Sequence, residues 1–183
     1  ANYNGTAQIT LDTQDLGNTG AGGNLTDHDV LTVNVTPVND LPTIEQASVT
    51  LSEEALPHGI GADVSDATVR TGTIAVADVD GDALTLGLVA PTQTLTADGV
   101  PIQWSGSGTA ADPLVGTTTS GGTTHTVLQA SIEWVNGQAQ YTVSLLGPVD
   151  HVSNGAPTDA LTLDFGVRVD DGHGTPVQQP HCT

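Results

Sequence analysis

Apolar residues recur at every second position in this chain, and this alternation constrains the fold more than any other feature of the sequence. The clearest run occupies alternate positions of one nine-residue stretch: Leu161, Leu163, Phe165, Val167 and Val169. Successive side chains of a β-strand point to opposite faces, so this pattern predicts a single half-buried strand. Shorter alternating runs at 31–35, 74–76 and 84–88 predict further strands. Helical periodicity is nearly absent, and the sequence therefore predicts an antiparallel β-sandwich.

Two dipeptides mark tight turns between predicted strands. Asn136-Gly137 favours a two-residue hairpin loop. Directly opposed residues in such a hairpin share one face, and we expect the core-facing set to be Ile132 with Tyr141, Trp134 with Ala139, and then Val143. Asp98-Gly99 predicts a second hairpin, pairing Leu95 with Ile102. Pro101 lacks a backbone donor, so its strand should lie at an edge or beside a bulge.

A connector bracketed by proline divides the chain. It runs from Val35 to Ile44, with Pro37 and Pro42 on either side of Asn39-Asp40, and it contains no tight-turn dipeptide. The residues before it hold two or three strands, too few for an independent core. We therefore expect residues 1–40 to be the C-terminal part of one β repeat plus a linker, and residues 41–183 to be a complete β-sandwich.

The charge of the chain excludes some partners and suggests another. There are 21 Asp and Glu residues against only two basic residues, Arg70 and Arg168, for a net formal charge of −19. Nucleic acids and anionic membrane surfaces are bound through Lys and Arg, so neither is an expected partner. Seventeen of the acids are Asp, which suits tight turns and calcium loops. We expect a divalent cation to neutralise part of this charge.

The segment Asp78-Val79-Asp80-Gly81-Asp82 is the best candidate for a cation site. Ca²⁺ takes six to eight oxygen ligands, and alternating Asp residues around a glycine place carboxylates on a sharply turning backbone. The alternative is an acidic turn in solvent. The segment is not an EF-hand, because the Glu at the twelfth position and the flanking helices are missing. Zinc is disfavoured, because the six His residues are scattered and Cys182 is the only cysteine.

Several of these segments resemble one protein family. Val35 to Ile44 resembles the linker of cadherin-like repeats, in which an Asn-Asp pair precedes a proline, and the segment from Asp78 to Thr85 is similar to their acidic loop. The stretch from Tyr141 to Gly172 is similar to the extender repeats of giant RTX adhesins, which bacteria export by type I secretion. The Gly- and Asp-rich nonapeptides of an RTX β-roll are not present.

The resemblance implies an immunoglobulin- or cadherin-like sandwich that calcium stiffens into a tandem array. Such a structural extender would lie outside the cell, on the bacterial surface or in a biofilm, and would project ligand-binding regions without catalysing a reaction. Its partners would be neighbouring repeats of the same chain, with a host or biofilm ligand reached through other domains. The metal ligands carried over are Asn39, Asp40, Glu53, Glu54, Asp78, Asp80, Asp82, Asp170 and Asp171. Glu53 and Glu54 are alternatives to each other, with capping of a short turn as the simpler role for either, and Asp170 and Asp171 would serve the following joint.

Two rival functions use other residues. A module of such an adhesin that binds a glycan or a peptide would need an exposed aromatic platform, and Trp104 on its edge hairpin is the available candidate. A glycosidase would need two carboxylates in a cleft. Glu133 beside Trp134 is the tempting member, but the hairpin register predicts an exposed sheet face for it, with no partner acid. No Gly-x-Ser-x-Gly motif supports serine hydrolase chemistry.

Overall fold

The chain folds into two compact units, Ala1–Asp40 and Leu41–Thr183, which are described separately. The computed structural model describes residues 3–17, 21–45, 49–53, 56, 68–150, 160–174 and 176–179. Over these ranges every strand pairing is antiparallel and no residue is helical. Within these ranges, therefore, no helix of the length and apolarity needed to span a membrane occurs.

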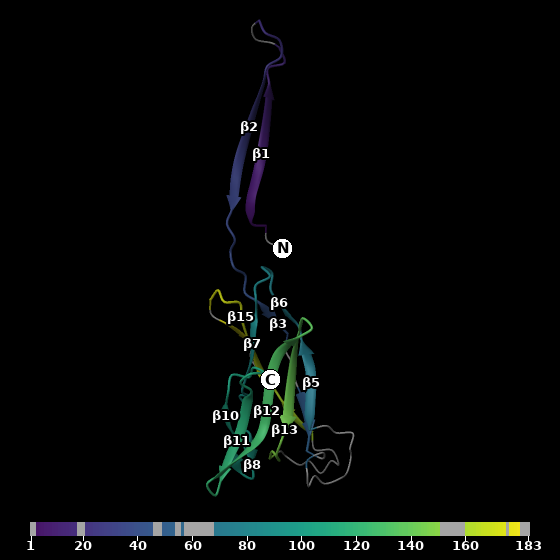
Figure 1. Cartoon of the computed structure of the whole chain (residues 1–183), viewed down its shortest axis with the longest axis vertical. Helices are drawn as coiled ribbons and strands as arrows, with labels where there is room; N and C mark the ends of the chain where they lie inside the picture. The colour runs from purple at the N-terminus through teal and green to yellow at the C-terminus, as the bar shows by residue number, and fades with distance from the viewer. Residues whose placement is uncertain are drawn as a thin grey trace. The chain divides into compact units, whose positions relative to one another are not determined.

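The first unit contains a two-stranded ribbon made of β1 (Gly5–Gln14) and β2 (Thr26–Val35) (Figure 1). Gly5 pairs with Val35 and Gln14 with Thr26, so the alternation of each strand sorts side chains onto two faces. One face carries apolar residues that remain largely exposed: Ile9, Leu11, Leu31, Val33 and Val35. The predicted strand at 31–35 is thus confirmed, although its apolar side chains are not buried within the described ribbon.

The second unit is a sandwich of two layers. Its first layer is a five-stranded sheet, and its strands in spatial order are β10 (Gln103–Ser105), β11 (Leu114–Ser120), β12 (Thr123–Val135), β13 (Gln138–Leu145) and β5 (Val69–Ile74). The second layer consists of two smaller sheets. One has the strands β16 (Val177–Gln179), β15 (Gly166–Asp170) and β7 (Thr85–Val89) in spatial order, and the other pairs β14 (Ala160–Leu163) with β4 (Val49–Ser52).

Two short ribbons complete the unit. β3 (Thr43–Ile44) pairs with β6 (Val76–Ala77), where the chain enters the sandwich. β8 (Thr96–Ala97) pairs with β9 (Val100–Pro101) at the opposite end of the same unit (Figure 1). The two ends of the sandwich therefore carry different sets of loops.

Both layers contribute to one apolar core. Leu128 of the five-stranded sheet and Leu51, Leu163 and Val169 of the other layer are completely buried and belong to a single cluster. Burial of such side chains is the main favourable term in folding. The predicted all-β antiparallel sandwich is confirmed.

The Asn136-Gly137 hairpin has the predicted register, with Ile132 opposite Tyr141 and Trp134 opposite Ala139. Asn136 and Gly137 both have positive φ, 51° and 78°, as a type I′ turn requires. Ile132 and Ala139 are buried as expected, but the expectation for Trp134 is wrong. Trp134 is 42% exposed, although Ala139 opposite it is buried.

The prediction of one continuous strand over 161–169 is also wrong. The chain forms β14 and β15 in two different sheets, with a break at Asp164–Phe165. β14 pairs with β4, and after the break β15 pairs with β7. The alternation still holds across the break, because Phe165 and the apolar residues of β15 all face the core. Alternation of apolar residues in the sequence indicates which side chains face the core, but it does not indicate which strand pairs with which.

The core makes a direct prediction about stability. Leu128→Ala should lower the free energy of unfolding by about 2–5 kcal/mol, because it leaves a cavity in a fully packed region. Leu146→Ala makes the same chemical change at a side chain that is 51% exposed, and it should cost no more than about 0.5 kcal/mol. Urea denaturation followed by tryptophan fluorescence measures both, and equal losses would contradict the packing described.

Candidate metal centre

The acidic loop, Asp78–Asp82, lies at the end of the sandwich where the chain enters. It follows β6 directly, and β7 begins at Thr85. Thr43 of β3 pairs with Ala77, and its hydroxyl donates to the Ala77 carbonyl at 3.1 Å. The first strand of the second unit therefore holds the start of this loop in place.

Asp78 organises the loop through one of its carboxylate oxygens. Asp78 Oδ1 accepts hydrogen bonds from the backbone N–H groups of Asp80 (2.8 Å), Gly81 (2.9 Å) and Asp82 (3.4 Å). Gly81 has a φ of 79°, a conformation that costs little only for glycine. These contacts wrap the backbone around one carboxylate, as the spacing of the acids and the glycine suggests.

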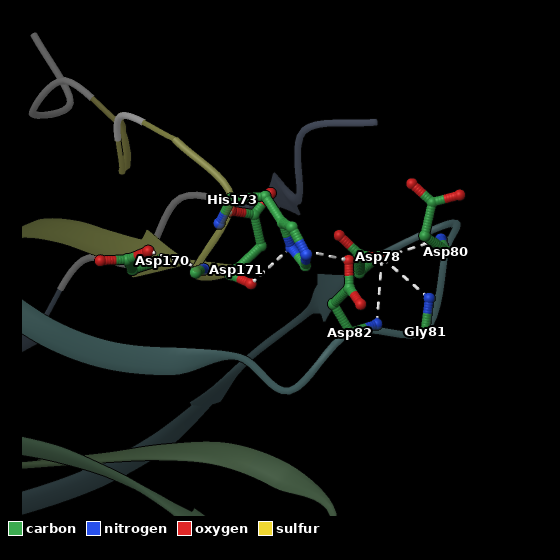
Figure 2. A network of polar contacts seen from close by, with 8 residues as sticks. Asp78, Asp80, Gly81, Asp82, Asp170, Asp171 and His173 are labelled. Carbon is green, nitrogen blue, oxygen red and sulfur yellow. Dashed lines mark hydrogen bonds and ion pairs between the residues drawn. The ribbon is translucent and has the colours of Figure 1, made fainter. Parts of the chain in front are cut away.

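The wrapped backbone brings three carboxylates together. One oxygen from each of Asp78, Asp80 and Asp82 lies within 4.8 Å of the other two. Two oxygens bound to the same ion at about 2.4 Å can be at most about 4.8 Å apart, so the separations in this group meet the limit that a shared cation sets. Three of the predicted ligands thus form a cluster that could hold a metal ion (Figure 2).

The second oxygen of Asp78 strengthens this interpretation. Asp78 Oδ2 is inaccessible to solvent and has no hydrogen-bond donor among the described residues. A buried carboxylate oxygen without a donor or a cation carries an uncompensated desolvation cost. The hydrogen bonds that Asp78 makes with described residues are to backbone N–H groups and all use Oδ1, so none of these residues satisfies Oδ2.

A second loop meets the acidic loop from the end of β15. Asp170, the last residue of β15, pairs with Thr85 at the start of β7, and this register carries the following residues toward Asp82. His173 Nδ1 lies 3.3 Å from Asp82 Oδ2 and 3.0 Å from the main-chain oxygen of Asp171 (Figure 2). Both neighbours are acceptors, so the proton of a neutral His173 ring resides on Nδ1.

Asp170 and Asp171 themselves hold this second loop in shape. Asp170 Oδ1 accepts from the N–H of Gly172 at 2.8 Å, and Asp171 Oδ1 accepts from the N–H of His173 at 2.9 Å. Asp171 is 6% exposed. The resemblance implied that these acids serve a following joint, whereas the strand register places them at the same end as the acidic loop. Their role as ligands stays a prediction.

Glu53 lies elsewhere in the sandwich. It follows β4, whose last residue, Ser52, pairs with Ala160, whereas the acidic loop lies beside Asp170 at the far end of β15. Glu53 Oε1 accepts a hydrogen bond from the backbone N–H of the buried Val149. This contact gives Glu53 a structural role away from the Asp78 cluster. Glu54 lies outside the described residues.

Asn39 and Asp40 lie in the extended segment that follows β2, at the end of the first unit. Both make polar interactions there. Their proposed part in metal binding stays a prediction, because it concerns the junction and not the interior of either unit.

Sequence reasoning missed two residues that support the acidic loop. His173 contacts Asp82 from a distant part of the chain, and nothing local to His173 signals that contact. Trp134 Nε1 donates to the Leu84 carbonyl at 3.0 Å, which anchors the backbone two residues after Asp82. Trp134 is thus partly exposed at the end of its strand, and its indole has a structural role through this hydrogen bond.

The aromatic residue expected to serve as a binding platform is used differently. Trp104 packs edge-on against Phe165, with ring centroids 5.9 Å apart and planes at 88°, and it is partly buried against the core. Such T-shaped contacts are typical of core aromatics. Part of the Trp104 ring is thus used in packing, and its role as a stacking platform stays a prediction.

Searches for a matching protein family, a curated protein or a solved structure found none for this chain.

Because Asp78 Oδ2 has no donor among the described residues, we expect calcium to reverse the order of stability of the parent chain and the variant Asp78→Asn. In chelator, Asp78→Asn should be as stable as the parent chain or more stable by about 1–3 kcal/mol, because it keeps the Oδ1 acceptor and removes a buried charge. With a bound divalent cation, the order should reverse, since the variant loses a charged ligand. Thermal unfolding in EGTA and in calcium measures both.

Asp98→Asn is the matched control for this comparison. It makes the same change of charge at an exposed turn at the opposite end of the sandwich, where Asn suits the positive φ of 51°. It should keep the parent's response to calcium. A variant Asp78→Asn that is less stable than the parent under both conditions would contradict the interpretation of Oδ2.

Proposed function

We propose that this chain is a calcium-stabilised structural extender module of a large secreted bacterial surface adhesin, and that it rigidifies and projects ligand-binding regions of that protein. The observation that carries the proposal is the buried, donor-free Oδ2 of Asp78 within a group of three carboxylates. A bound cation would remove the cost of that oxygen. The resemblance of the connector and the acidic loop to extender repeats supplies the structural role.

Calcium is the cation that suits this loop best. The ligand atoms are all carboxylate oxygens, which calcium prefers, whereas structural zinc sites are built from cysteine and histidine. The loop has no further acids within it, so backbone carbonyls and water would complete the six to eight ligands that calcium takes. Magnesium demands a stricter octahedron and keeps its own water, which makes it a useful control.

The overall charge supports the same conclusion. With 21 acidic and two basic side chains, the chain repels itself, and each divalent ion bound at a cluster of carboxylates reduces that repulsion. Extracellular calcium modules bind with dissociation constants of about 0.1–1 mM. Such a module would be filled outside the cell and empty in the cytosol, and it would stiffen after export.

Calcium should therefore raise the melting temperature of the chain. At a concentration one hundred times the dissociation constant, binding adds about 2.7 kcal/mol, or about 5–10 °C for a chain of this size. Asp80→Asn should weaken calcium binding at least about tenfold, because it removes one charged ligand, and calorimetric titration measures this directly. Magnesium and Asp98→Asn are the controls. A melting temperature that does not respond to calcium would overturn the metal site.

The extender role makes a separate prediction about flexibility. Small-angle scattering should give a narrower distribution of dimensions in calcium than in EGTA, because bound ions restrict motion between successive units. The variant Asp80→Asn should resemble the parent in EGTA even when calcium is present. If calcium binds to the parent but the scattering does not change, the chain has a metal site without an extender role.

A further inference from the structure

A polar groove lies at the end of the second unit opposite the acidic loop, and it does not depend on the proposed metal. It has a volume of about 490 Å³, within the range of about 300–1,000 Å³ typical of small-molecule sites. One wall is the β11–β12 hairpin, and the other is formed by the Asp98 turn and Leu146–Pro148. This set of residues is called the β11–β12 groove below.

The first wall is an extension of the sandwich's inner face. Leu114 is buried in the core, and Thr118 lies four residues further along β11, on the same face. Thr118 pairs with His125, and Ser120 pairs with Thr123, so these four polar side chains share that face. The inner surface of the sheet thus changes from apolar to hydroxyl-rich where the core ends.

Thr118 is the key residue of the groove. It is 7% exposed and lines the groove, yet its hydroxyl makes no hydrogen bond to any described residue. The hydroxyl is not one of the buried side-chain atoms that lack a partner, so it is open to the groove, where water or a ligand can pair with it. The neighbouring Thr119, on the other face of the strand, does pair, with its hydroxyl 3.1 Å from that of Thr124.

The second wall is held in place by backbone hydrogen bonds. Asp150 accepts from the N–H groups of Asp98 (3.1 Å) and Gly99 (2.7 Å), and its own N–H donates to Thr96 at 2.7 Å. The N–H groups of Leu146 and Gly147 both donate to the Val127 carbonyl, at 2.7 and 3.1 Å. The groove is therefore formed before any ligand arrives, which lowers the entropy cost of binding.

The chemistry of the walls selects among ligand classes. Neither Arg70 nor Arg168 lines the groove, and Asp98 does, so an anionic ligand would meet a carboxylate and no side-chain cation. None of the described residues that line it is Phe, Tyr or Trp, so a large platform for nucleobases or aromatic peptides is missing there. Hydroxyls, an imidazole and a carboxylate remain, beside the exposed apolar side chain of Leu146 and the ring of Pro148.

We infer that the β11–β12 groove binds a neutral saccharide. Its hydroxyl groups would pair with Thr118, Ser120, His125 and Asp98, and the apolar face of a sugar ring would lie against Leu146 and Pro148. The ligand would take the place of water at the Thr118 hydroxyl, which opens into the groove. The module would then contribute to adhesion itself, in addition to any role in projecting other domains.

The test uses the full chain and two matched probes, lactose and 3′-sialyllactose. In ¹H–¹⁵N correlation spectra, lactose or the methyl glycosides of mannose, galactose and N-acetylglucosamine should shift amide resonances of the β11–β12 groove. Sialyllactose, which adds an anionic sugar, should bind more weakly than lactose. The inference is overturned if none of the neutral sugars shifts these resonances, or if sialyllactose or a peptide library gives the stronger response.

A pair of isosteric variants locates the site. Thr118→Val should fold, because the lost hydroxyl has no partner, and it should weaken binding about 3- to 10-fold through one lost hydrogen bond. Thr119→Val makes the same change on the opposite face and should bind as the parent does. Equal affinity for the parent and Thr118→Val would place the sugar elsewhere and overturn the inference.

Two further measurements test the same wall with a second variant and test whether saccharide binding is independent of the metal. If Thr118→Val is unstable, Ser120→Ala tests the same wall at an exposed side chain and should also weaken binding. Saccharide binding should persist in EGTA and in Asp80→Asn, because the acidic loop lies at the other end of the sandwich. Loss of saccharide binding in EGTA would show that the groove depends on metal and would contradict its independence.

Discussion

The packing of two sheets on one apolar core determines which loops meet at each end of the second unit. Leu128 belongs to the same buried cluster as Leu163 and Val169 of the other layer, so strands far apart in sequence are packed together. β15 then pairs with β7 so that Asp170 lies opposite Thr85. The loop after β15 and the loop before β7 therefore lie side by side, and His173 contacts Asp82. The polar chemistry at this end is a consequence of apolar packing.

The two ends of the second unit carry different polar sites. At one end, Asp78 places three backbone N–H groups on one oxygen and leaves the other oxygen without a donor. At the other end, Thr118 continues the inner face beyond the core with an unpaired hydroxyl. Among the described residues only the Asp78 oxygen is both buried and without a donor, which fits a cation, whereas the Thr118 hydroxyl opens into the groove, where a hydroxyl-bearing ligand could reach it.

Much of the fold follows from local sequence rules. Positive φ at Asn136 and Gly137 and the register of their hairpin were predictable, because a two-residue type I′ loop fixes the pairing on both sides. The break between Leu163 and Gly166 was not predictable, because alternation continues through it while the pairing partner changes from β4 to β7. Trp134 has the expected register but not the expected burial, and its indole Nε1 donates to the Leu84 carbonyl.

The sequence alone determined the all-β class, the positions of the turns and the grouping of Asp78, Asp80 and Asp82, because these depend on residues close together in the chain. Only the tertiary structure decided that Glu53 accepts a hydrogen bond from the backbone of Val149, that His173 contacts Asp82 of the acidic loop, and that Thr118 ends a core face inside a groove. These contacts join residues separated by long stretches of chain, and packing between the sheets, which no local pattern encodes, brings them together.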